Sequence, residues 1–344
     1  MNISMEPFRA LVADKLPDSQ RSFGFVVQTL IIGVSTWVAS NLPLMVSSFG
    51  VSNEAEPGVI PMSVQVAFGI GAAVFILSIL YTVFTTDEYP PEDIEAFRKE
   101  QIEKSGFRNT LREVFKNIAE MPTTMKRLGV VQFFSWFAFF CMWSMANPAL
   151  TDHIFNAAKP EAIDFAVSTS EQIQNYQIDD RAFNEASNKV GSFMGNYGLS
   201  SMVFALLLTV WTAKRRINRK LVHMFSLLIG GIGFISMYLI DNPTMLILSF
   251  VCIGFSWGSI LSMPYAMLSS TLDPKRMGVY MGIFNMFIVL PQIVAATSLT
   301  IIYQGVFGEE PINAMLLAGT SLIIASASNF LIKNKKAVSY IPEG

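Results

Sequence analysis

Eight uncharged apolar stretches constrain this chain more than any other feature of its sequence. None of them contains Asp, Glu, Lys or Arg, and they occupy residues 24–47, 59–84, 128–150, 190–212, 221–240, 244–268, 278–302 and 312–332. A helix needs about 20 mostly apolar residues to cross the hydrocarbon core of a bilayer. Because the runs are continuous rather than alternating, they do not suit a membrane β-barrel. The sequence therefore predicts an all-α membrane protein with eight complete transmembrane helices.

Composition agrees with this class and excludes several others. Hydrophobic residues make up 52% of the chain and charged residues 15%, against roughly 25% charged in an average soluble domain. A net charge of -2 provides no basic field, so no nucleic-acid partner is expected. The sequence has no glycine-rich phosphate loop, and His153 and His223 stand far apart, without metal-ligand spacing. We expect no cofactor, no metal and no enzymatic activity, and we favour a monomer surrounded by membrane lipid.

The positions of the basic residues predict the orientation. All but three of the 24 Lys and Arg residues lie before the first span, in 85–127, in 213–220, in 273–276 or in the tail. The three exceptions, Lys159, Arg181 and Lys189, lie on the opposite side. Since basic residues concentrate on the cytoplasmic side, both chain ends are expected there.

The spans are divided unevenly by a cytoplasmic linker at 85–127, with two spans before it and six after it. Many secondary transporters consist of two six-helix halves related by an axis along the membrane normal. We therefore interpret 1–84 as the remainder of an N-terminal half and 128–344 as a complete C-terminal half. Residues 2–13 are expected to be the end of a further span, with upstream spans missing.

The long outer loop at 151–189 is polar. We expect Asp179 or Asp180 to cap a short helix that leads into the span at 190. The loop is interpreted either as a solvated connection or as a lid over a substrate path.

The third span carries the first candidate binding face. Gln132, Trp136, Trp143 and Asn147 follow one another at offsets of 4, 7 and 4, so they share one side of a helix. Aromatic rings beside amides suit a sugar, because its C–H faces lie on rings and its hydroxyls pair with amides. The alternative is that this face packs against neighbouring helices, with the amides as interhelical hydrogen bonds.

Other spans add further polar candidates for the path. Asn285 and Gln292 share a face of the seventh span, on either side of the helix bend expected at Pro291. Tyr265 lies in the sixth span, and Asn196 in the fourth is expected to face the interior because it is costly in lipid. The alternative for the small residues and aromatics of these spans is again close helix packing.

The spans contain no carboxylate, although a proton-coupled transporter needs an ionisable group in the membrane. A proton carrier is therefore expected at a span end or in sequence upstream. The candidates at span ends are Glu6, Asp152, His153 and Glu185.

Three stretches carry a family resemblance. They read "MEPFRALVADKLP", "QRSFGFVVQTLIIGVSTWVAS" and "GSILSMPYAMLSSTLDPKRMGVYMGIFNMFIVLPQIV". The chain resembles bacterial members of the sucrose and maltose proton symporter branch of the major facilitator superfamily, relatives of plant sucrose carriers. The sharpest matches are the pattern from Pro7 to Asp14 and the stretch from Gly282 to Gln292.

The resemblance implies a twelve-span transporter, of which this chain would be the fifth to twelfth spans. In that family an aspartate shortly before the arginine pattern is associated with proton coupling, and it would lie upstream of Met1. Arg9 and Asp14 would then be coupling or gating residues, although Arg9 also suits simple snorkelling to the interface. Plant relatives place an arginine and a glutamate near the start of the eighth span, where this chain has Glu185.

These features predict a proton-coupled importer of a disaccharide such as maltose or sucrose, working by alternating access in the bacterial cytoplasmic membrane. The alternatives are a membrane sugar sensor or structural partner that does not transport, and an exporter of another small molecule.

Overall fold

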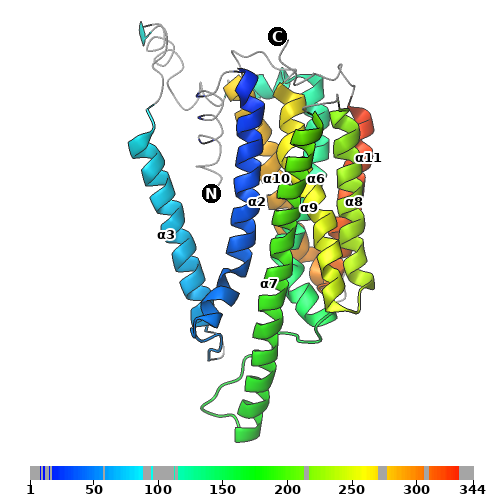
Figure 1. The fold of residues 1–344 in the computed structure, drawn as a ribbon. Helices are drawn as coiled ribbons and strands as arrows, with labels where there is room; N and C mark the ends of the chain where they lie inside the picture. The colour runs from blue at the N-terminus through cyan, green and yellow to red at the C-terminus, as the bar shows by residue number, and fades with distance from the viewer. Residues whose placement is uncertain are drawn as a thin grey trace.

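The computed structural model describes residues 8, 11, 15, 18–56, 59–87, 94–95, 112, 115–212, 217–269, 277–305 and 310–332. The main helices are α2 (Asp18–Ser48), α3 (Met62–Thr85), α6 (Thr123–His153), α7 (Ser170–Thr212), α8 (Arg219–Leu239), α9 (Leu246–Ser269), α10 (Met277–Gly305) and α11 (Asn313–Ser328). Figure 1 labels these helices. A short 3-10 turn, η1 (Pro243–Met245), precedes α9, and another, η3 (Asn329–Leu331), follows α11. No strand occurs in these residues.

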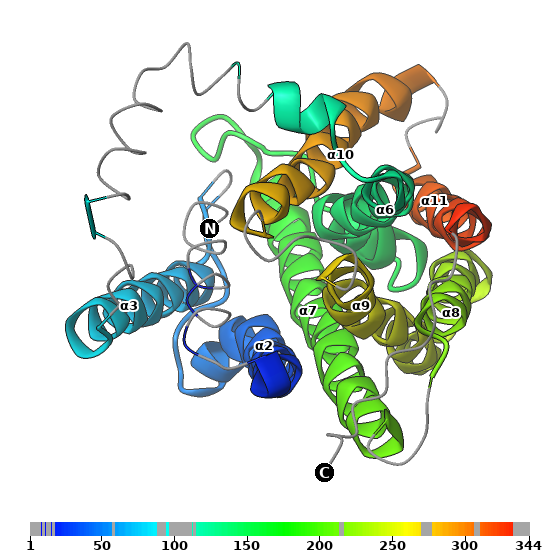
Figure 2. The same cartoon turned by 90° about the horizontal axis from the view of Figure 1, so that it is seen from above.

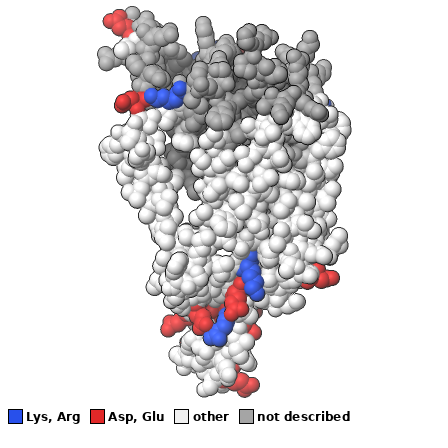
Figure 3. Space-filling model, viewed as in Figure 1, with Lys and Arg blue, Asp and Glu red and all other residues white. Residues whose placement is uncertain are grey.

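The prediction of eight transmembrane helices is confirmed. Within the described residues, eight helices are long and apolar enough to cross a membrane. On the face drawn in Figure 3, the described charged side chains gather towards the two ends, and uncharged surface lies between them. The protein is therefore an all-α membrane protein whose apolar middle matches the hydrocarbon layer of a bilayer.

Helices α6 to α11 pack in a reciprocal pattern. Helix α6 packs against α10 and α11, whereas α9 packs against α7 and α8 (Figure 2). These six helices form two consecutive triplets, α6 to α8 and α9 to α11. The first helix of each triplet therefore contacts the second and third helices of the other triplet. Contacts between α8 and α11 close the far side of the bundle. Among the described transmembrane helices, α6 and α9 are the most deeply buried, and residues on their facing sides are the best placed to form an interior site.

Helix α2 lies against α7 through small residues. A Cβ atom at Gly33 would stand 2.7 Å from the Gly198 carbonyl oxygen, and one at Gly198 would stand 2.8 Å from the Gly33 carbonyl oxygen. The two backbones therefore approach as closely as small residues allow. Helix α3 packs against α2 and stands away from the six-helix bundle, with most of its apolar side chains exposed (Figures 1 and 2).

The expected helix start at Asp179 or Asp180 is wrong. Helix α7 begins at Ser170 and runs without interruption to Thr212. Its first turn is capped reciprocally: Thr169 Oγ1 accepts from the Gln172 backbone N–H at 3.3 Å, and Gln172 Oε1 accepts from the Thr169 N–H at 2.9 Å. This is a capping box, and the sequence Thr-Ser-Glu-Gln contains its residues.

Candidate functional site

Aromatic side chains from four helices meet at the centre of the six-helix bundle. Helix α6 contributes Trp136, Phe139 and Trp143 at offsets of three and four, which places them on one face. The Trp257 ring of α9 lies 5.5, 4.9 and 5.4 Å from these three rings, centroid to centroid. Tyr197 of α7 and Phe234 of α8 pack against Phe139 at 6.3 and 5.8 Å. We call these six residues the aromatic cluster.

The three indole N–H groups of the aromatic cluster differ in their hydrogen bonding. Trp143 donates from Nε1 to the Tyr197 hydroxyl at 3.3 Å. Nε1 of Trp136 and Nε1 of Trp257 are buried, and neither has a hydrogen-bond partner among the described residues. A buried donor without a partner costs about 1–3 kcal/mol, so native structures rarely leave one without a water or ligand.

Two amide side chains also have unpaired polar atoms, and one of them, Gln132, lies next to the aromatic cluster. Gln132, one turn before Trp136, is completely buried, and neither Nε2 nor Oε1 has a partner among the described residues. Asn285 of α10 is half-buried, and its Oδ1 likewise lacks a partner there. The unsatisfied groups therefore include both donors and acceptors, and all of them are uncharged.

Helix α10, which carries Asn285, packs against α6. A Cβ at Gly129 of α6 would lie 2.6 Å from the ring of Phe287, so α10 approaches α6 where a side chain is missing. The fully buried neighbour of Asn285, Phe284, packs its ring 5.5 Å from that of Tyr265 on α9. The predicted candidate Tyr265 therefore contacts α10 at Phe284, the residue before Asn285.

Trp143 forms the accessible edge of the aromatic cluster. Its side chain is 38% exposed, whereas Trp136 and Trp257 are 5% and 7% exposed. Of the three tryptophans, Trp143 is therefore the one that a ligand outside the cluster can contact directly. The arrangement suits a neutral molecule that carries both apolar faces and hydroxyl groups.

Three further predicted residues, on α6, α10 and α7, are not part of the aromatic cluster. Asn147 donates from Nδ2 to Ser187 Oγ at 3.2 Å, which is an interhelical bond between α6 and α7. Gln292 is half-buried on α10. Glu185 is exposed on the polar first part of α7, residues 170–189, which we call the extension of α7. Arg9 and Asp14 lie outside the described residues.

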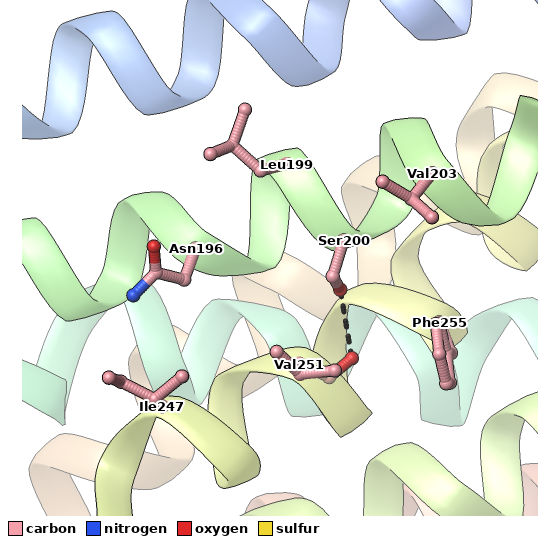
Figure 4. A pocket seen from close by; sticks show the side chains of 7 residues that line it. All are labelled: Asn196, Leu199, Ser200, Val203, Ile247, Val251 and Phe255. Atoms are coloured by element: carbon pink, nitrogen blue, oxygen red, sulfur yellow. Dashed lines mark hydrogen bonds between the residues drawn. The ribbon is translucent and has the colours of Figure 1, made fainter. Parts of the chain in front are cut away.

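Asn196 lines a separate pocket between α7 and α9, with a volume of about 320 Å³ (Figure 4). Because it precedes Tyr197 by one residue, its side chain leaves the helix about 100° away from the aromatic cluster. The other lining residues are Leu199, Ser200, Val203, Ile247, Val251 and Phe255. The Ser200 hydroxyl is already used, since it donates to the Val251 carbonyl at 2.8 Å. This mostly apolar pocket offers few polar groups to a sugar.

Sequence reasoning found only part of the aromatic cluster. Spacing along α6 identified Trp136 and Trp143, whereas Trp257, Phe139, Tyr197 and Phe234 were not among the predicted site residues. Phe139 had a usable signal, because it follows Trp136 by three residues and precedes Trp143 by four. Among the described residues, no group of three or more His, Cys, Asp or Glu side chains is arranged to hold a metal ion.

Comparison with known proteins identifies a family. The model described as Major Facilitator Superfamily matches residues 3–296. No curated protein matches the chain.

Proposed function

Since this chain belongs to the Major Facilitator Superfamily and is a multi-pass membrane transporter, we propose that it imports a neutral sugar together with protons. The sugar class is a disaccharide such as maltose or sucrose, and the membrane is a bacterial cytoplasmic membrane with both chain ends inside. Transport proceeds by alternating access, as in other transporters built from helical repeats.

The aromatic cluster with its unpaired polar atoms supports the sugar proposal. Sugars present C–H faces that lie on aromatic rings, and their hydroxyls both donate and accept hydrogen bonds. Trp136 and Trp257 offer free indole donors, and Gln132 offers an amide with both a donor and an acceptor. The apolar stretches that contribute the cluster contain no Asp, Glu, Lys or Arg, so a charged substrate would lack a counter-ion there.

Proton coupling has separate support. It follows from the resemblance of the Pro7 to Asp14 pattern to the symporter branch, in which a nearby aspartate is associated with coupling. Arg9 and Asp14 are the proposed coupling residues at that end, and Glu185 is a proposed gating residue on α7. The exposed position of Glu185 leaves its carboxylate accessible from outside the bundle.

Uptake of radiolabelled maltose and sucrose into membrane vesicles that contain the full chain tests both parts of the proposal. Accumulation that requires an inward proton gradient supports symport, and accumulation independent of the gradient overturns it. The variant Trp257→Phe retains an aromatic ring but loses the donor, so sugar affinity is expected to fall. Absence of binding of either sugar in equilibrium dialysis overturns the proposed substrate class.

A further inference from the structure

The pocket between α7 and α9 opens on the outer surface of the bundle (Figure 4). Val203 of α7 and Ile247 of α9, which line it, are 44% and 43% exposed. On α7, Tyr197 points into the aromatic cluster, whereas Asn196 leaves the helix on a different side and lines the pocket. Since α7 and α9 are long and apolar enough to cross a membrane, the pocket faces the acyl chains of the surrounding lipid.

The groove formed by this pocket starts near one membrane surface and extends inwards. The uncharged run of α7 begins at residue 190, so Asn196 lies about 9 Å inside it along the helix, and Val203 lies about 10 Å deeper. Helical side chains lean towards the N-terminus of their helix, which brings the Asn196 amide nearer the surface. Ile247 lies in the first turn of α9, directly after η1. Both walls of the groove therefore begin at the end of the bundle that carries the extension of α7.

Asn196 gives this apolar groove one unpaired amide. Its side chain is half-buried and makes no hydrogen bond to the rest of the described chain. Ser200, the other polar residue that lines the pocket, already donates to the Val251 carbonyl. An amide at this depth costs free energy unless it finds a partner, because hydrocarbon offers none. The ester carbonyls of a phospholipid accept hydrogen bonds, and they lie between the phosphate and the acyl chains.

Lys189 adds a cation on the same face of α7, closer to the membrane surface. Lys189, Asn196 and Val203 follow one another at intervals of seven residues, which keeps them within about 40° around the helix. Lys189 is exposed, and it forms no ion pair with any described residue, including Glu185 one turn away. Its long side chain can hold the ammonium at the interface, where lipid phosphates lie. This face thus presents a cation, an amide and an apolar groove in the order of phosphate, ester and acyl chain.

We propose that the groove between α7 and α9 binds one phospholipid. An acyl chain lies between the helices against Val203 and Phe255, an ester carbonyl accepts from Asn196 Nδ2, and the phosphate pairs with Lys189. The pocket volume of about 320 Å³ is at the lower end for small-ligand sites, so it holds part of one chain rather than a whole lipid. This site is separate from the aromatic cluster, and it does not depend on the proposed sugar.

Native mass spectrometry of the full chain, extracted in a mild detergent and supplied with phosphatidylglycerol, counts the lipids that remain bound. We expect the unmodified chain to retain one. Val203→Trp fills the groove from α7, and Ile247→Trp fills it from α9, so each should lose the lipid. Two variants on different helices keep the test valid if one of them fails to fold. Val210→Trp is the matched control, because Val210 is exposed on α7 and does not line the pocket.

Two polar variants test how the lipid is recognised. Asn196→Leu keeps the size of the side chain but loses the donor, so phosphatidylglycerol affinity should fall about two- to tenfold. Lys189→Gln should weaken binding of phosphatidylglycerol and leave that of diacylglycerol, which has no phosphate, unchanged. Lys159→Gln makes the same change of charge in the connection between α6 and α7, and it should have no effect.

The outcomes separate the site from its individual contacts. Absence of bound lipid on the unmodified chain, or groove-filling variants that retain lipid as Val210→Trp does, overturns the site. Equal binding of phosphatidylglycerol and diacylglycerol by the unmodified chain overturns the pairing of Lys189 with phosphate. Unchanged affinity in Asn196→Leu overturns the hydrogen bond to the ester.

Discussion

Arg181 donates from Nε to the Glu54 carboxylate at 2.8 Å, joining the extension of α7 to the loop between α2 and α3. The loop is itself held to the start of α3, because the Ser63 hydroxyl donates to Asn53 Oδ1 at 2.6 Å. Both charged side chains stay well hydrated, being 63% and 59% exposed. The pair is therefore a weak, breakable link between two segments far apart in sequence.

Reversing one of these charges should weaken the link. Glu54→Arg places two cations together, and we expect a loss of about 0.2–1 kcal/mol in the free energy of unfolding, which is typical of exposed pairs. Glu54→Arg combined with Arg181→Glu should restore it. The measurement is a double-mutant cycle by denaturant unfolding in detergent, at low and high salt, since screening removes an exposed pair.

Glu171→Arg is the control for this cycle. Glu171 lies on the same helix, is exposed and has no ion pair among the described residues. The Glu171→Arg substitution changes the net charge of α7 and leaves the Arg181–Glu54 pair unchanged. A coupling energy indistinguishable from zero at low salt would contradict a contribution from the Arg181–Glu54 pair.

Substitution of Trp136 or Trp257 in the aromatic cluster should change sugar affinity more than it changes protein stability. Trp136→Phe and Trp257→Phe remove donors that have no partner, so the unliganded protein should lose little stability from the missing N–H. Sugar affinity should fall, because a bound hydroxyl loses its donor. Isothermal titration with maltose and sucrose, together with thermal unfolding of the same samples, measures the two effects.

Trp143→Phe should differ from these two variants in its effect on protein stability. Its indole N–H already donates to Tyr197, so the variant should lose about 0.5–1.5 kcal/mol of stability even without ligand. If Trp136→Phe and Trp257→Phe lose stability but bind sugar normally, their indole N–H groups are structural and the proposed site is wrong.

Two glycines should respond oppositely to the same substitution. A Cβ at Gly254 of α9 would overlap the Ser200 hydroxyl and the Tyr197 carbonyl oxygen on α7. Gly254→Ala should therefore destabilise the protein by about 1–3 kcal/mol through overpacking. Gly282→Ala on α10 meets open space and should be neutral or stabilising by up to about 1 kcal/mol. Thermal unfolding in detergent compares them, and equal losses would contradict the close α7–α9 contact.

The transmembrane helices were predictable because each is one long apolar run, and a bilayer imposes a minimum length on such a run. The ends of α8, Arg219 and Leu239, lie close to those of the predicted span 221–240, whereas α2 and α6 begin several residues before their predicted spans, at Asp18 and Thr123. The start of α7 was missed because its first turns are polar. Hydropathy finds membrane-spanning residues, and it does not find the part of a helix that extends into water.

The aromatic cluster was only partly predictable for a different reason. Helical spacing shows that Trp136 and Trp143 share a face, since both lie on one helix. It does not show which residues of other helices meet that face, because this depends on how α7 and α9 are rotated about their axes. Asn196 and Tyr197 illustrate the limit: the polar residue was predicted to face inward, but its neighbour is the one that joins the cluster.

The capping box at the start of α7 provides a final test of where this helix begins. Thr169→Ala removes the oxygen that accepts from the Gln172 N–H, and we expect a loss of about 0.5–2 kcal/mol of local helix stability. Hydrogen exchange should then speed up for the amides of the first turns of α7, and not for the apolar stretch from 190 onward. Asp179→Ala is the matched control, because Asp179 lies inside the helix and should leave those amides unchanged. Faster exchange limited to the Asp179→Ala variant would instead indicate that the helix starts at Asp179.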